Sequence, residues 1–222
     1  MKISSIVLSR VLAFVDTIDL SPVGGVDARG FVRETAEQFH FQKYPQTLDE
    51  FDTQKGMEFV SGRLGKKTIS KFVIWNNILV VESRFTTTET QEMLQEMLLW
   101  GTEKFKLTYS PEMIQHYAYV SDLSFYSDAP LLSLDPLLRR IAERIGSSLT
   151  KIWQEPILYE PFDLKIGHDP LARKWGIAPF QITRRAEHRF SENKYFSEAP
   201  LPTDEHIALL EEYEKEIVAR AQ

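Results

Sequence analysis

Apolar and polar positions alternate in short runs along much of the first half of the chain, as they do in strands with one buried face. Three such runs follow one another at Met57 to Leu64, Thr68 to Trp75 and Ile78 to Phe85. The last two are separated by Asn76-Asn77, and asparagine tolerates the positive φ of a two-residue hairpin turn. We therefore predict three strands, the last two forming a hairpin. The apolar run from Ile3 to Ile18 fits a strand or a helix, and its β-branched residues favour a strand in its later part.

Helical spacing of apolar residues appears behind several capping residues. Asp27 is suited to begin a short helix, because its carboxylate can accept from the first free backbone N–H groups. Thr86 and Glu89 have the spacing of a capping box, which predicts a helix that runs to about Lys106. Thr203-Asp204 is also a helix-start signal and opens the last predicted helix.

The second half repeats this order of elements. His116 to Tyr126 reads as a strand, and Ser133 caps a long helix. We expect one stripe of that helix to face the core: Leu137, Leu138, Ile141, Ile145, Leu149 and Ile152. Two strands are predicted at Ile157 to His168 and Phe180 to Phe190. The segment from Phe190 to Pro202 has no evident periodicity and is predicted to be an irregular loop.

This order of elements predicts an α+β fold with mainly antiparallel sheet. It contains two β-α-β-β-α halves, which is the ferredoxin-like order with helices on one face of the sheet. A single continuous sheet fits equally well. We assign 1–111 to a first subdomain and 112–222 to a second, and we expect one compact unit because no Pro, Gly or Ser-rich linker separates them.

Composition and charge exclude several function classes. The 222 residues include no cysteine, which removes thiolate nucleophiles, iron–sulfur clusters and cysteine zinc sites. There are 26 Lys and Arg against 32 Asp and Glu, a net charge of −6, which argues against coating nucleic acid or an anionic membrane with the whole surface. Arg10 interrupts the apolar run near the start of the sequence, so we expect a cytoplasmic protein without a membrane span.

The glycine-rich segment from Pro22 to Gly30 partly resembles a phosphate-binding loop. Gly25 and Gly30 have the spacing of such a loop, but Phe31 and Val32 stand where a lysine and a hydroxyl residue should follow. An ordinary turn between a strand and a helix is the favoured interpretation.

The strands predicted at Ile157 to His168 and Phe180 to Phe190 would place four polar residues on otherwise apolar faces. These residues are Glu160, His168, Arg184 and His188. Polar groups that face a core need partners, so we predict a polar network in which Glu160 pairs with Arg184 or His188. The alternative is a metal- or His/carboxylate-assisted hydrolase. It would use His168, His188, Asp163 or Glu187. Neighbouring residues of a strand point to opposite faces, so we expect no metal site and no cofactor.

A basic and aromatic segment occupies 165–196. Between Lys165 and Lys194 there are seven basic residues against three acidic ones. The residues that would bind an anionic ligand, a nucleotide or single-stranded nucleic acid are Arg173, Lys174, Trp175, Arg184, Arg185, Arg189, Lys194 and Tyr195. The alternative is that these arginines pair with the acidic helix that follows.

No catalytic signature is found, so the first functional hypothesis is a non-catalytic interaction protein. Aromatic residues make up 12% of the chain, and Trp, Tyr and Phe are the residues that anchor interfaces. We expect a homo-oligomer or an assembly subunit with a protein partner. Binding of an anionic ligand or nucleic acid is the second hypothesis, and hydrolysis is the third.

Overall fold

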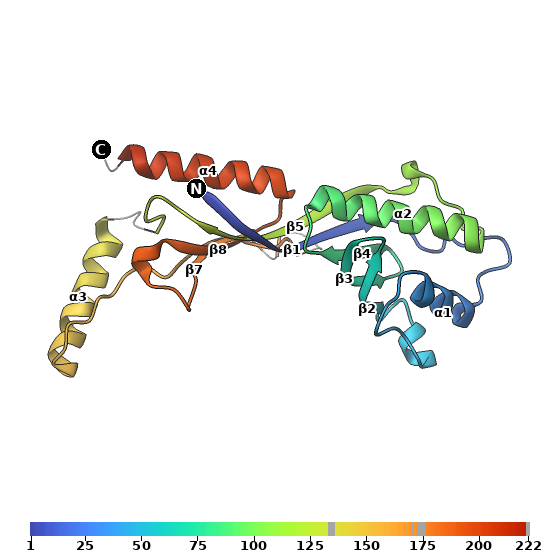
Figure 1. Ribbon diagram of the computed structural model, residues 1–222, viewed down its shortest axis with the longest axis horizontal. Helices are drawn as coiled ribbons and strands as arrows, with labels where there is room; N and C mark the ends of the chain where they lie inside the picture. The colour runs from blue at the N-terminus through green and yellow to red at the C-terminus, as the bar shows by residue number, and fades with distance from the viewer. Residues whose placement is uncertain (133–135, 170, 173–175, 221–222) are drawn as a thin grey trace. The chain divides into compact units, whose positions relative to one another are not determined.

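The computed structural model describes residues 1–132, 136–169, 171–172 and 176–220. In these residues eight strands form one antiparallel sheet, accompanied by four α-helices (Figure 1). The strands are β1 (Lys2–Phe14), β2 (Met57–Leu64), β3 (Lys67–Ile74), β4 (Ile78–Ser83), β5 (His116–Tyr126), β6 (Asp163–Ile166), β7 (Phe180–Arg184) and β8 (Lys194–Ala199). The helices are α1 (Ala28–Gln38), α2 (Thr87–Phe105), α3 (Pro136–Trp153) and α4 (Thr203–Arg220). Three 3₁₀ helices are η1 (Leu48–Phe51), η2 (Pro111–Met113) and η3 (Phe190–Glu192).

The sheet has the strand order β2-β3-β4-β1-β5-β8-β7-β6. Consecutive strands β2, β3 and β4 form an antiparallel meander, and β1 lies beside the last of them. The second half repeats this arrangement, because β6, β7 and β8 form a meander and β5 lies beside β8. Each half of the sequence is therefore one strand, a helix, a three-stranded meander and a second helix.

This topology confirms the α+β class with an antiparallel sheet and helices. The ferredoxin-like order is not confirmed. The sequence pattern assigned two strands to the second half after its first helix, whereas the structure has three strands there. A meander keeps neighbouring strands antiparallel, so no helix has to cross over between parallel strands.

Three residues directly opposite one another across β2, β3 and β4 show why these strands form. Phe59 pairs with Phe72, and Phe72 pairs with Val81. All three side chains are buried on the same face of the sheet. Because side chains in a strand alternate between faces, this register brings the apolar positions of each run to that face.

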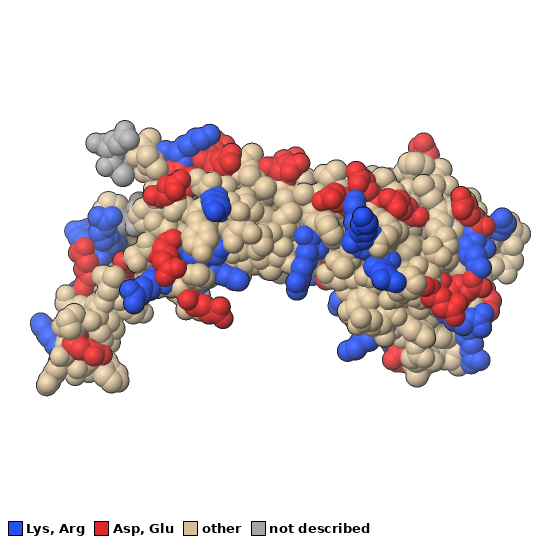
Figure 2. Space-filling view, in the orientation of Figure 1, with Lys and Arg blue, Asp and Glu red and all other residues tan. Residues whose placement is uncertain are grey.

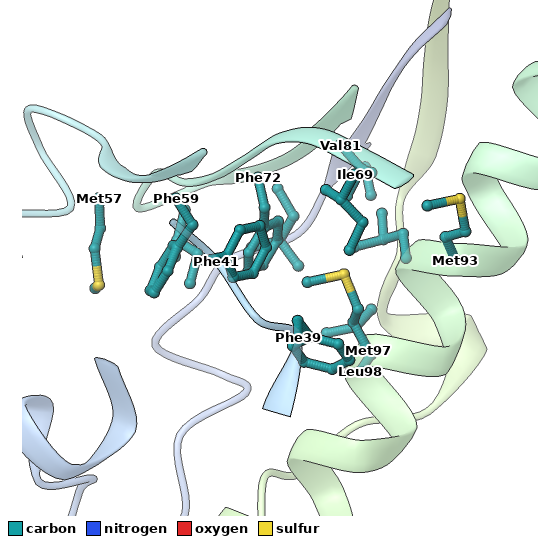
Figure 3. Packing of buried hydrophobic residues seen from close by; sticks show 14 of the residues in the cluster. Phe39, Phe41, Met57, Phe59, Ile69, Phe72, Val81, Met93, Met97 and Leu98 are labelled. Atoms are coloured by element: carbon teal, nitrogen blue, oxygen red, sulfur yellow. The ribbon is translucent and has the colours of Figure 1, made fainter. Parts of the chain in front are cut away.

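Helix α2 covers this apolar face. Its N-terminus is closed by the capping box predicted from the sequence: the Glu89 N–H donates to the Thr86 hydroxyl at 3.2 Å, and the Thr86 N–H donates to the Glu89 carboxylate at 3.2 Å. Figure 3 shows Met97 and Leu98 of α2 beside Phe39, which lies below the strands that carry Phe72. The helix and the sheet thus share one apolar cluster.

Contacts within the chain group it into two units. Unit 1 comprises 1–5, 122–199 and 205–222, and unit 2 comprises 6–121 and 200–204. Strands β1 and β5 contribute residues to both units. Each unit therefore combines segments that are distant in the sequence. The division at residue 111 stays a prediction.

Two of the sequence-based element boundaries need correction. The segment from Phe190 to Pro202 is not an irregular loop, because it contains η3 and the paired strand β8. Its alternation is hidden because Lys194 and Tyr195 are neighbours in the chain and both are buried. The strands predicted at Ile157 to His168 and Phe180 to Phe190 are shorter, and only β6 and β7 are paired within them.

Two threonines at helix starts satisfy each other's backbone groups. The Thr87 N–H donates to the Thr203 hydroxyl at 2.9 Å, and the Thr203 N–H donates to the Thr87 hydroxyl at 2.8 Å. Both residues are buried. The first N–H groups of a helix have no partner within the helix, so buried helix starts need acceptors of this kind.

Replacing Thr203 by Val should lower the free energy of unfolding by about 1–3 kcal/mol, because it leaves the buried Thr87 N–H without its acceptor. Valine has nearly the same shape as threonine, so the loss reports the hydroxyl. Urea unfolding followed by circular dichroism measures the change.

Thr203→Ser is the matched control, because it retains the hydroxyl, and it should lie closer to the wild type than Thr203→Val does. Equal unfolding midpoints for the valine and serine variants would show that the hydrogen bond from the Thr87 N–H to the Thr203 hydroxyl contributes nothing to stability.

Candidate functional site

Arg184, at the end of β7, is the centre of a polar cluster in unit 1. Its side chain is 3% exposed, and its Nη2 lies 2.8 Å from a carboxylate oxygen of Glu160. Its other nitrogens donate to the carbonyl oxygens of Pro161 at 3.1 Å and Phe190 at 3.0 Å. The guanidinium also lies 4.2 Å from the centre of the Phe190 ring. The donors of Arg184 are therefore engaged within the protein.

The two histidines of the predicted network lie apart from this cluster. His188 Nδ1 lies 2.8 Å from the Glu192 carboxylate, and this hydrogen bond contributes most to lowering the pKa of Glu192. His168 is exposed, as are Asp163 and Glu187. Within the residues that the structure describes, no three His, Asp or Glu side chains gather closely enough to hold a metal ion. The structure brings together only Glu160 and Arg184 of the four predicted network residues.

The predicted anionic-ligand residues occupy different environments. Lys194 is buried, and its ammonium lies 3.7 Å from the centre of the Tyr126 ring. Burial lowers the pKa of Lys194, and the charge of Arg185 lowers it further. Tyr195 is fully buried, and its hydroxyl accepts from the Leu131 N–H at 3.2 Å. These two side chains belong to the interior of unit 1.

The remaining residues of that set are exposed or lie outside the described residues. Arg185 and Arg189 are exposed, and Arg185 borders a polar depression of about 370 Å³ together with Gln181 and Phe196. Arg173, Lys174 and Trp175 lie outside the described residues. On the face that Figure 2 shows, basic, acidic and uncharged side chains are interspersed and form no broad basic region.

The apolar stripe of α3 is exposed, which corrects the expectation that it faces the core. Ile152 is 71% exposed and Ile141 is 47% exposed. The helix buries a different side, where Ala142 and Gly146 lie. The backbone after the helix approaches so closely that a side chain at Gly146 would stand 2.9 Å from the Ile157 carbonyl oxygen. A small-residue face is thus covered, and the large apolar residues are left outside.

Exposed apolar residues continue beyond the stripe. Among the described residues between Leu137 and Ile177, twelve large apolar side chains are exposed: Leu137, Leu138, Ile141, Ile145, Ile152, Trp153, Leu158, Tyr159, Phe162, Ile166, Leu171 and Ile177. We name this set the α3 surface. At 100° per residue, Arg140, Arg144 and Lys151 lie along one border of the helical stripe. Large contiguous apolar patches on soluble proteins mark interaction sites, ligand-binding grooves or segments prone to aggregation.

The sequence contains the signal for this surface, but the same pattern also predicts a core-facing helix. The spacing of Leu138, Ile141, Ile145 and Ile152 indicates one apolar helix face but does not say what covers it.

In the described residues, none of the helices is long and apolar enough to cross a membrane. No known family model matches this chain, and no curated protein matches it.

Replacing Arg184 by Met should lower the free energy of unfolding by about 2–4 kcal/mol, because two partly buried carbonyl oxygens and the Glu160 carboxylate lose their donor. Arg185→Met is the matched control at the next, exposed position, and it should change the free energy by less than about 0.5 kcal/mol. Urea unfolding measures both. Equal losses in the two variants would show that the buried cluster has no special structural role.

Tyr213 makes stability depend on pH in the alkaline range. Burial raises the pKa of Tyr213 to about 12, and its hydroxyl donates to the Leu131 carbonyl oxygen at 3.0 Å. In the unfolded chain the phenol titrates near about pH 10, so between these values unfolding releases its proton. Stability should therefore fall as the pH rises through this window.

Tyr213→Phe should remove this titration, so the stability lost between about pH 9 and about pH 11 should be smaller than in the wild type by about 1.3 kcal/mol in total. Urea unfolding of both proteins at about pH 9 and about pH 11 measures the losses, since these values bracket the start of the titration. Identical losses would contradict the assignment.

Proposed function

We propose that the protein is a non-catalytic assembly subunit that associates with a second copy of itself through the α3 surface. The observation that supports this proposal is the exposure of twelve large apolar side chains in the described part of the range between Leu137 and Ile177. Water contact with these side chains is unfavourable by roughly 25 cal/mol per Å² of apolar surface. A partner that covers them would gain this free energy.

The composition of the helical stripe suits an interface. A standard interface has an apolar centre and a polar rim. The stripe offers the exposed residues Leu137, Leu138, Ile141, Ile145 and Ile152 for the centre, and Arg140, Arg144 and Lys151 for part of the rim. In a two-fold dimer the same surface is used by both copies, so each copy covers the exposed residues of the other.

A second copy is the favoured occupant because it presents the same apolar surface, so two copies can bury these side chains against each other. A soluble acidic partner would match the basic border but would cover the apolar stripe only if it carried an apolar surface of its own. Binding of an anionic ligand or nucleic acid and hydrolysis stay predictions from the sequence, as does the cytoplasmic location. For the first of these, Arg184 and Lys194 are both buried and not free to bind.

Ile152→Glu should convert the assembly to a single chain, because a carboxylate at the centre of an apolar interface loses its hydration without gaining a partner. The expected wild-type mass by light scattering is twice the chain mass of 25.7 kDa. The variant should have the single-chain mass at the same concentration and the same circular dichroism spectrum, since Ile152 is already exposed.

Arg139→Glu is the matched control, because it places the same carboxylate at an exposed position on the side of the helix away from both Ile152 and the basic border. It should keep the wild-type mass. A wild-type chain that has the single-chain mass at every concentration would overturn the proposal, and so would a wild-type chain that binds lipid vesicles through Ile152 without forming a dimer.

A further inference from the structure

Unit 2 contains a cavity of about 320 Å³ between the sheet, α1 and α2. The sheet contributes Met57 and Phe72 to its wall, and α2 contributes Met97 and Leu98. Figure 3 shows Phe39 beside Met97 and Leu98 on the helix side of the apolar cluster, and Met57 apart from them on the strand side. The wall is therefore an extension of the apolar core.

The cavity reaches the solvent along the segment that follows β1. Ile18 and Ser21 of this segment line the cavity and are exposed. Ile18 is 73% exposed although it is one of the apolar lining residues. A small molecule thus has a path to the cavity that does not require the sheet or α2 to move.

The wall carries no ionisable group. None of the described residues that line the cavity is Asp, Glu, Lys, Arg or His. A charged ligand would lose its hydration in this wall without meeting an opposite charge. The ligand class that fits is therefore neutral.

The wall does contain polar groups. Of its four hydroxyl groups, those of Thr17, Ser21 and Thr53 each have a hydrogen-bond partner. The Thr17 hydroxyl donates to the Asn76 carbonyl oxygen at 2.9 Å, and the Thr53 hydroxyl donates to the Asn76 side-chain oxygen. Thr35 of α1 differs, because it is only 2% exposed and its hydroxyl has no partner among the described residues. A buried hydroxyl without a partner is unfavourable, and a ligand that pairs with it would remove this cost.

We propose that this cavity binds a neutral, mainly hydrocarbon molecule with a single hydroxyl group that pairs with Thr35. A cavity of about 150 Å³ holds benzene, so one of roughly twice this volume suits about a dozen non-hydrogen atoms. Such a ligand buries its hydrocarbon body against Phe39, Phe72, Met97 and Leu98. This activity is independent of the association proposed for α3.

Three probes of equal length test the proposal on the full chain by isothermal titration calorimetry at neutral pH. They are 4-phenyl-1-butanol, n-butylbenzene and 4-phenylbutyrate, which differ only at one end. The alcohol should bind, the hydrocarbon should bind about fivefold more weakly because it cannot satisfy the hydroxyl, and the carboxylate should bind at least about tenfold more weakly than the alcohol.

Thr35→Val assigns the binding to this cavity. It removes the hydroxyl and keeps the shape, so it should weaken the alcohol by about fivefold and leave the hydrocarbon unchanged. It should also raise the unfolding temperature of the free protein, because a buried hydroxyl without a partner is lost. Thr102→Val is the matched control: its hydroxyl already donates to the Leu98 carbonyl oxygen, and it should change neither affinity.

Three outcomes would overturn the proposal. The first is that neither neutral probe binds up to its solubility. The second is that the carboxylate binds as tightly as the alcohol. The third is that Thr35→Val leaves the alcohol unchanged, which would place the binding elsewhere.

Discussion

The fold of unit 2 depends on covering the apolar face of β2, β3 and β4. The register that places Phe59, Phe72 and Val81 in one row makes this face almost wholly apolar. Water cannot satisfy such a face, and α2 supplies most of the cover through Met93, Leu94, Met97 and Leu98. Helix α1 is shorter and contributes less. The space that the two helices leave is the cavity in which a ligand is proposed to bind.

The same requirement is met differently in unit 1. Helix α3 buries its small residues Ala142 and Gly146 against the chain that follows it, so its large apolar residues remain exposed. The large apolar side chains of this helix face are thus not covered by other described residues of the same chain. A second copy would complete it in the way that α2 completes the sheet of unit 2. One physical cause, apolar surface that needs cover, thus underlies both proposals.

Buried polar groups determine which details of the structure are unique. The reciprocal bonds between Thr87 and Thr203 satisfy the first N–H groups of α2 and α4. Arg184 satisfies two backbone carbonyl oxygens and a carboxylate at the end of β7. Each arrangement accepts only one geometry, because a displaced partner would leave a buried group without a hydrogen bond. Thr35 departs from this rule, which is why its hydroxyl is informative about a ligand.

The sequence by itself determined the features that depend on neighbouring residues. Alternation predicted β2, β3, β4 and β5, and the spacing of Thr86 and Glu89 predicted the capped start of α2. These signals are local, because strand alternation and helix capping act over a few residues. Only the tertiary structure decided that β8 is a strand, that the stripe of α3 is exposed and that Arg184 pairs with Glu160 while His188 pairs with Glu192. These outcomes depend on which distant segment lies beside each residue, and an apolar or charged side chain has the same local pattern whichever partner covers it.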